Sequence, residues 1–153
     1  YDYILIDCPP SLGLLTVNAL TAADYLLIPT MAETFAASGI TQLYDTYRSV
    51  KKYTNPDLQI DGVLLTRTER TKVTRTIQEL TEKIAEYMGA DVYRTTIRNN
   101  VIIKEAQAVQ ENVFDYIESK AQTKGERVSE ASRNFVTDCL HFVKEFVEKE
   151  RKQ

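Results

Sequence analysis

Asp7 is the acidic residue in this sequence whose position most favours chemistry. It directly follows the apolar run at residues 3–6 and precedes Pro9 and Pro10. Such a run is typical of a strand buried on both faces of a parallel sheet, and the prolines must end that strand and begin a stiff loop. Open α/β sheets hold their ligands at the carboxyl ends of strands. Asp7 could therefore bind magnesium, accept a phosphoryl group or cap the next helix.

One stretch of the sequence, residues 67–75, is locally basic. Its cations are Arg67, Arg70, Lys72 and Arg75, with Glu69 as the single acid and hydroxyl residues between them. Helix N-termini normally prefer acids, so four cations at a predicted helix start indicate an external anion. Phosphates of a nucleotide or of DNA would fit, and a solvated helix start is the alternative interpretation.

Other chemistries have less support. His141, the only histidine, lies in the predicted last helix far from Asp7, so we interpret it as a partly exposed structural residue. Cys8 has no nearby base or CxxC partner and fits a small buried residue better than a nucleophile. The five glycines form neither GxGxxG nor GxxxxGK[ST], so this chain alone should bind ATP poorly.

The elements that must position these residues begin with a predicted βαβ unit. A helix over residues 14–23 joins the strand at 3–6 to a second apolar strand at 25–28, which is followed by Pro29. A helix between two such strands predicts parallel pairing and a right-handed crossover. The fold class is therefore α/β, a mostly parallel sheet with flanking helices.

A helix over residues 36–53 and a third strand over 58–66 continue this pattern. Thr66 and Arg67 should then lie on the same edge of the sheet as Asp7.

Further predicted elements follow the third strand, in which Gly62 indicates a close backbone approach. They are, in order, a helix ending at Gly89, a weak strand over 91–94, a loop over 97–100, a short helix over 101–109, a surface loop over 110–124 and a long helix from Gly125. The last helix has one apolar stripe, and glutamates interrupt its basic face. We expect it to pack onto the sheet rather than onto a membrane surface.

Composition limits the classes of protein. The 153 residues are 43% hydrophobic and 27% charged, as expected of a single soluble domain spanning residues 1–153. A net charge of -3 excludes a histone-like composition. No apolar run approaches the roughly 18 residues of a membrane span, and Cys8 and Cys139 suggest neither a zinc site nor a disulfide, so we expect a cytoplasmic protein. Because the sequence starts without Met in a buried-type strand, we expect the downstream part of a longer protein.

Residues 1–20 resemble the Walker B segment and following helix of ParA/Soj-type partition ATPases, a branch of the P-loop fold with a deviant Walker A motif. The resemblance spans nearly the whole chain. It continues at Leu27 to Pro29, Glu33, Phe35, Ala36, Gly39, Leu43, Gly62 to Thr66 and Asn100 to Ala106.

The resemblance implies an ATP-driven homodimer that binds DNA non-specifically and hydrolyses ATP under stimulation by a ParB-type centromere-binding partner. It implies ATP and magnesium as cofactors of the intact protein, the bacterial cytoplasm and nucleoid as its location, and no membrane. The fold would be P-loop NTPase-like and truncated at its N-terminal side. Because the Walker A loop is missing from this sequence, the isolated chain would be inactive.

Site residues follow from the same resemblance. Asp7 would be the Walker B acid, holding magnesium through water, and Pro9 and Pro10 would lie in the loop that senses the γ-phosphate. The residues that match the region around adenine are Thr66, Arg67, Arg98 and Asn100. Where relatives read Ile-Pro-Arg-Asn, this chain reads Ile-Arg-Asn-Asn at residues 97–100.

The DNA-binding residues implied by the resemblance centre on Arg70. Relatives have a second DNA-binding arginine where this chain has Ile102. DNA binding would then rest also on Lys72, Arg75 and Lys104.

Two other functions fit the pattern. One is a MinD-like ATPase that cycles on a membrane. The acidic residues of the last helix argue against this function. The other is a non-catalytic interaction module that keeps the sheet and uses residues 67–75 to bind an acidic partner.

Overall fold

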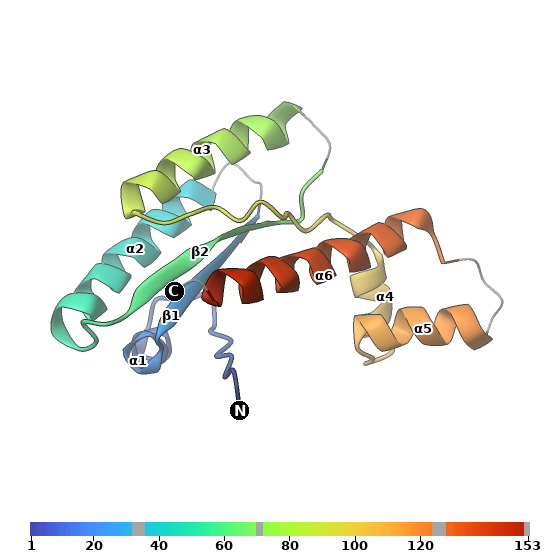
Figure 1. The fold of residues 1–153 in the computed structure, drawn as a ribbon, viewed down its shortest axis with the longest axis horizontal. Helices are drawn as coiled ribbons and strands as arrows, with labels where there is room; N and C mark the ends of the chain where they lie inside the picture. Colours follow the sequence, from blue (N-terminus) through green and yellow to red (C-terminus); the bar gives the residue numbers. More distant parts are fainter. Residues whose placement is uncertain (32–35, 70–71, 124–127, 152–153) are drawn as a thin grey trace.

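A computed structural model describes residues 1–31, 36–69, 72–123 and 128–151. Helices and strands alternate through the first half of the chain, and helices follow in the second half (Figure 1). The elements are α1 (Leu14–Ala22), β1 (Tyr25–Met31), α2 (Ala36–Tyr53), β2 (Gln59–Thr66), α3 (Lys72–Met88), α4 (Ile102–Ala108), α5 (Val113–Thr123) and α6 (Glu130–Glu150).

The two strands β1 and β2 pair in parallel, as the intervening helix α2 requires. The register runs from Tyr25 opposite Gln59 to Met31 opposite Thr66. The strand predicted to end before Pro29 is therefore longer, because β1 continues through that proline to Met31. A proline is tolerated on an edge strand, where its missing N–H group interrupts no ladder.

A bulge interrupts the register near the start of β2. Leu26 lies opposite Ile60 and Leu27 lies opposite Gly62, so Asp61 is the extra residue. Bulges bend a strand and redirect a side chain. The close approach predicted at Gly62 is confirmed, because an added Cβ would lie 2.9 Å from Cε2 of Tyr93.

The segment after α3 lies beside β2 without forming a regular strand. Isolated parallel bridges join Val92 to Val63 and Arg98 to Thr68. The weak strand predicted over residues 91–94 is thus reduced to single bridges, and the contact extends further along the chain than expected.

The core lies between the sheet and helices α2 and α3, which cover one of its faces (Figure 1). Leu58, Val63 and Leu65 of this region have no exposed surface. One cluster of buried residues joins both strands to both helices, namely Ile28, Ile40, Val63, Ala85 and Met88. The apolar periodicity of these elements is what buries them together.

Helix α6 lies on the side of the sheet away from α2 and α3, with its start near α4 and α5 and its end beside the strands (Figure 1). Its Phe142 ring lies 5.1 Å from the ring of Tyr93, and its Phe146 ring lies 5.7 Å from that of Tyr3. Both partner rings belong to residues outside the strands, and the last helix meets β2 itself near its end, where Nζ of Lys149 lies 3.7 Å from the carboxylate of Asp61. The predicted packing onto the sheet is therefore confirmed for the end of the helix. Among the described residues, no helix is long and apolar enough to cross a membrane.

The strand predicted at residues 3–6 is wrong, because residues 1–9 form no helix or strand. Ile4 and Leu5 are 80% and 88% exposed. A strand exists only with a hydrogen-bonded neighbour. Within the described part of the chain β1 and β2 pair with each other, and isolated bridges join Val63 of β2 to Val92 and Thr68, just beyond β2, to Arg98, so residues 3–6 are not paired with either strand.

The surface loop predicted over residues 110–124 is also wrong, because this stretch contains helix α5. The Asn112 side chain accepts a hydrogen bond from the Phe114 amide at 2.8 Å and so caps the helix start. Lys120 forms an ion pair with Glu105 of α4 at 2.9 Å. The apolar residues Phe114, Ile117 and Ala121, spaced three and four apart, are the helical signal in this stretch. The short helix expected before it is confirmed as α4.

Candidate functional site

Two predicted site residues, Thr66 and Arg67, lie at the carboxyl end of β2 and contact the end of β1. The Thr66 hydroxyl donates to the Thr30 carbonyl at 3.1 Å, and Nη1 of Arg67 lies 3.1 Å from Sδ of Met31. Arg67 has a φ of 52°, in the left-handed region that a side chain with a Cβ rarely adopts. Backbone strain of this kind clusters at ligand sites, so the conformation of Arg67 supports a site at this edge.

Residues 94–100 are hydrogen-bonded to the same edge of the sheet. The Ile97 amide donates to the Leu65 carbonyl at 2.9 Å, and the Thr68 amide donates to the Ile97 carbonyl at 3.0 Å. The Asn99 amide returns a bond to the Thr68 carbonyl at 3.1 Å. The stretch containing Arg98 and Asn100 therefore lies beside the end of β2.

A polar hollow of about 770 Å³ opens beside this segment. Threonine, amide, arginine and carboxylate side chains line it, together with the single histidine. The lining residues are Thr68, Glu69, Thr74, Gln78, Arg94, Thr95, Thr96, Arg98, Asn99, Asp138 and His141. Hydroxyl and amide groups of this kind can bind the polar edges of a ligand.

Arg98 is engaged by Asp138 of α6. Nε and Nη2 of Arg98 each donate to the Asp138 carboxylate at 2.8 Å, and the Arg98 amide donates at 3.2 Å. The hydrogen bond to Asp138 raises the pKa of Arg98 despite the opposing effect of burial, so the guanidinium stays charged. Burial, aided by the charge of Asp138, raises the pKa of the Cys139 thiol and makes it a poor nucleophile.

Glu145, two turns further along α6, binds the same segment. Its Oε1 accepts from the Arg94 amide at 2.8 Å, and its Oε2 accepts from the Thr95 amide at 2.9 Å and the Thr95 hydroxyl at 2.7 Å. Burial alone would raise the pKa of Glu145, but the combined bonds from Thr95 and Arg94 outweigh it and the pKa is lowered. Glu145 is therefore held in its charged form.

Asn100 plays a local structural role. Its side-chain oxygen accepts from the Ile102 amide at 2.9 Å, at the start of α4. This bond fixes the end of the 97–100 loop.

Asp7, Pro9 and Pro10 are exposed and belong to no strand or helix. The loop that they begin is joined to α1 where the Thr16 hydroxyl donates to the Ser11 carbonyl at 2.7 Å. Within the described part of the chain, no group of three or more His, Cys, Asp or Glu residues could hold a metal ion. A lone carboxylate still fits magnesium, which keeps several waters and is bound through one or two carboxylates together with phosphates.

The predicted DNA-binding residues are placed in part. Arg75 on α3 and Lys104 on α4 are exposed, as a phosphate contact requires. Lys72 begins α3, and Arg70 lies outside the described residues.

Sequence reasoning missed the polar stripe of α6. Asp138, His141 and Glu145 are spaced three and four residues apart, and this spacing places them on one side of a helix. That spacing was the available signal, but the apolar stripe of the same helix is more prominent in the sequence. His141 is exposed at the polar hollow, in line with its prediction as a partly exposed residue.

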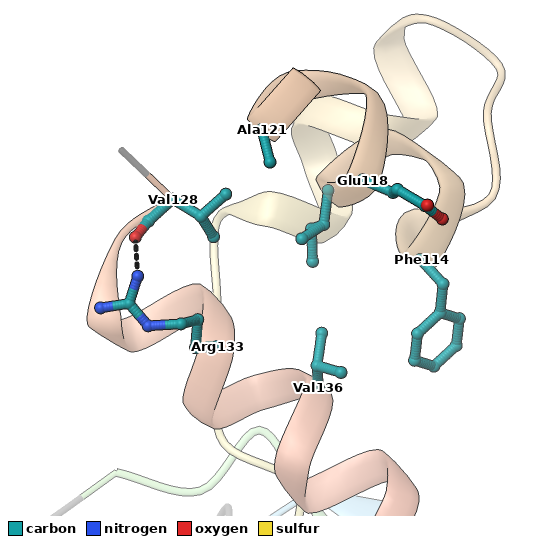
Figure 2. A pocket seen from close by; sticks show the side chains of 7 residues that line it. Phe114, Glu118, Ala121, Val128, Arg133 and Val136 are labelled. Carbon is teal, nitrogen blue, oxygen red and sulfur yellow. Dashed lines mark hydrogen bonds between the residues drawn. The ribbon is translucent and has the colours of Figure 1, made fainter. Parts of the chain in front are cut away.

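A second hollow, of about 510 Å³, lies between α5 and the start of α6 (Figure 2). Phe114, Ile117, Ala121, Val128 and Val136 make it apolar, and it also touches Glu118 and Arg133. The guanidinium of Arg133 donates to the Val128 carbonyl at 2.5 Å, as Figure 2 shows. An apolar lining suits hydrocarbon side chains and not a nucleotide.

Comparison with known proteins finds a matching family model and similar bacterial proteins. A family model described as "AAA domain" matches residues 1–60. The sporulation initiation inhibitor protein Soj of Bacillus subtilis is 50% identical over 106 residues, which are 69% of this chain and 41% of that protein. The chromosome partitioning protein ParA of Myxococcus xanthus is 42% identical over 122 residues, which are 78% of this chain and 42% of that protein. The chain thus spans 41% to 42% of the length of these relatives.

A solved structure resembles the fold. Cobyrinic acid a,c-diamide synthase from Mycobacterium smegmatis matches with a TM-score of 0.54 and 34% identity, over 77% of this chain and 47% of that one. The same enzyme with bound ADP and magnesium matches equally well. These findings confirm the α/β fold class with parallel strands, and the identity to Soj and ParA shows that the chain belongs to the ParA/Soj-type partition ATPase family.

Proposed function

We propose that this chain is the carboxyl-terminal part of a chromosome- or plasmid-partitioning ATPase. The observation that carries the proposal is the 50% identity to Soj over 106 residues. The geometry is compatible with it, because the carboxyl ends of parallel strands are where open α/β sheets bind ligands. Here Thr66, Arg67 and the 97–100 loop meet at that edge.

The nucleotide would lie at this edge of the sheet. Thr66, Arg67, Arg98 and Asn100 belong to the side that receives the base, and Pro9 and Pro10 to the side that senses the γ-phosphate. Asp7 would hold a water ligand of magnesium, and the metal would supply neutralisation of phosphate charge. ADP and magnesium in the similar synthase support the choice of ligand class.

The intact protein would bind DNA without sequence preference, through its phosphates. Arg70, Lys72, Arg75 and Lys104 would supply the positive charge. The protein would act as an ATP-bound dimer in the bacterial cytoplasm, associated with the nucleoid. A ParB-type partner would stimulate its hydrolysis of ATP.

The nucleotide part of the proposal is tested by measuring ATP hydrolysis of the intact protein with DNA and partner present. Asp7→Asn should reduce turnover by at least about 100-fold, because phosphoryl transfer depends on stabilising developing charge. Asp57→Asn, at an exposed turn position, is the matched control and should leave turnover unchanged. Equal turnover of the two variants would refute the role of Asp7.

The DNA part is tested by retardation of plasmid DNA at several salt concentrations. Arg70→Ala with Arg75→Ala should weaken binding and lower the salt slope by roughly one for each lost phosphate contact. Arg48→Ala, on the exposed side of α2, is the control for a lost surface charge. Unchanged binding by the double variant would remove residues 67–75 from the DNA surface.

A further inference from the structure

Helix α6 holds the outer side of the segment at residues 94–98 with two carboxylates. Glu145 accepts three hydrogen bonds from Arg94 and Thr95, two of them from backbone amides. Asp138 accepts three from Arg98, one of them from its amide. These amides face away from β2, and their partners are charged acceptors, which make stronger bonds than neutral ones.

The inner side of the same segment is held by β2 and by Thr68, just beyond the end of that strand. The Ile97 amide donates to Leu65, and the Ile97 carbonyl accepts from Thr68. Residues 94–98 are therefore clamped between a strand and a helix that lie far apart in the sequence. A shift of α6 along its axis would move both carboxylates and with them the 97–100 loop.

Covering a sheet edge explains the amide bonds but not the side chain of Arg98. Exposed edges of sheets need a cover, and acceptors for the three amides of Arg94, Thr95 and Arg98 would suffice for that. The Arg98 guanidinium also forms a bidentate pair with Asp138, a carboxylate whose side chain is only 9% exposed. Bidentate pairing fixes the orientation of a guanidinium as well as its position.

We propose that Asp138 and Glu145 are positioning residues for the base side of the nucleotide site, and that Arg98 acts through Asp138 to hold the 97–100 loop rather than contacting the nucleotide itself. This inference rests on the proposed function, because it assigns the base to that loop. It makes α6, which lines the polar hollow with Asp138 and His141, a support of the site.

The test uses the intact protein and the variants Glu145→Gln and Asp138→Asn, which keep the shape of each side chain and remove its charge. Glu148→Gln is the matched control, since Glu148 lies on the same helix and pairs with exposed Lys144 at 3.9 Å. Amide hydrogen exchange without nucleotide directly measures how well the two carboxylates protect the amides of residues 94–98. The exchange of residues 94 and 95 in Glu145→Gln, and of residue 98 in Asp138→Asn, should be roughly tenfold faster.

Binding of fluorescent ATP and GTP analogues then measures the effect on the site. Both variants should bind the ATP analogue about three- to tenfold more weakly and lose part of the preference for ATP over GTP, because a displaced loop reads the base less well. Turnover at saturating ATP should change little, whereas KM rises. Arg98→Lys keeps the charge but not the bidentate geometry, and it should change binding in the same direction.

Three results would overturn the proposal. Unchanged exchange in both variants would mean that the carboxylates do not hold the segment. Faster amide exchange with unchanged affinity for the ATP analogue and unchanged base preference would mean that α6 only covers the edge of the sheet. If the intact protein failed to bind the ATP analogue at all, both the proposed function and the positioning role would be wrong. The exchange data, taken without nucleotide, would still show whether the two carboxylates hold residues 94–98.

Discussion

Nζ of Lys149, near the end of α6, lies 3.7 Å from the carboxylate of Asp61, a side chain with no exposed surface. Lys149 also donates to the Asp61 carbonyl and lies 5.3 Å from the centre of the Tyr93 ring. The other carboxylate oxygen of Asp61 accepts from the Tyr93 hydroxyl. Because Asp61 is the extra residue of the bulge in β2, an irregularity of one strand joins the sheet to the last helix.

Lys149→Met should destabilise the protein by about 3 kcal/mol, because it leaves the buried charge of Asp61 without its partner. Asp61→Asn combined with Lys149→Met should cost less than the sum of the two single changes. Urea unfolding checks both. Lys144→Met is the control, since the Lys144 side chain is 75% exposed and its loss should cost less than about 1 kcal/mol. Equal effects of the two lysine changes would contradict the importance of the pair.

Gly62→Ala should destabilise the protein by about 1 to 3 kcal/mol, because the added methyl group would meet the Tyr93 ring at 2.9 Å and the Asp91 carbonyl at 3.1 Å. Gly39→Ala provides the opposite case. An added methyl at Gly39 in α2 meets nothing within 4 Å, so better helix propensity should raise stability by about 0.5 to 1 kcal/mol. Thermal unfolding of both variants should show shifts of opposite sign, and a stabilising Gly62→Ala would disprove the close approach.

Asn55→Ala should cost about 1 to 2 kcal/mol of stability. The Asn55 amide donates to the carbonyls of Leu20 and Ala23 at 3.1 and 2.7 Å, and so ties the end of α1 to the turn before β2. Without it, both carbonyls lose their partner. Asn18→Ala, an exposed change within α1, should be neutral or slightly stabilising. Denaturant unfolding in which both variants behave alike would refute the role of the Asn55 amide.

Acid should weaken the bonds that Glu145 makes. Its folded-state pKa is lowered, so this stabilisation is complete above the unfolded pKa of a glutamate, about 4.3, and is lost as pH falls through the folded pKa. Glu145→Gln should therefore flatten the dependence of unfolding free energy on pH below about 4.3. Urea unfolding at a series of pH values measures this, with Glu148→Gln as the comparison. The same slope in both variants would show that Glu145 is not held in its charged form.

Apolar periodicity, chain order and residue type predicted several helices and the pairing of the two strands. The helices α1, α2 and α4, the parallel pairing of β1 with β2 and the close approach at Gly62 all follow from apolar periodicity, chain order and residue type. The α5 helix was missed because its apolar side is short, and its stability comes in part from the Lys120 pair with Glu105 of α4.

The sequence by itself determined the family, through the motif at residues 1–20, and the α/β class, through alternating helical and strand periods. Only the tertiary structure decided that residues 3–6 form no strand, that Asp61 is a bulge residue buried against Lys149, and that Arg98 is paired with Asp138. The reason is physical. Periodicity reports which side of an element is apolar, whereas strand pairing and buried ion pairs depend on partners that lie far away in the sequence.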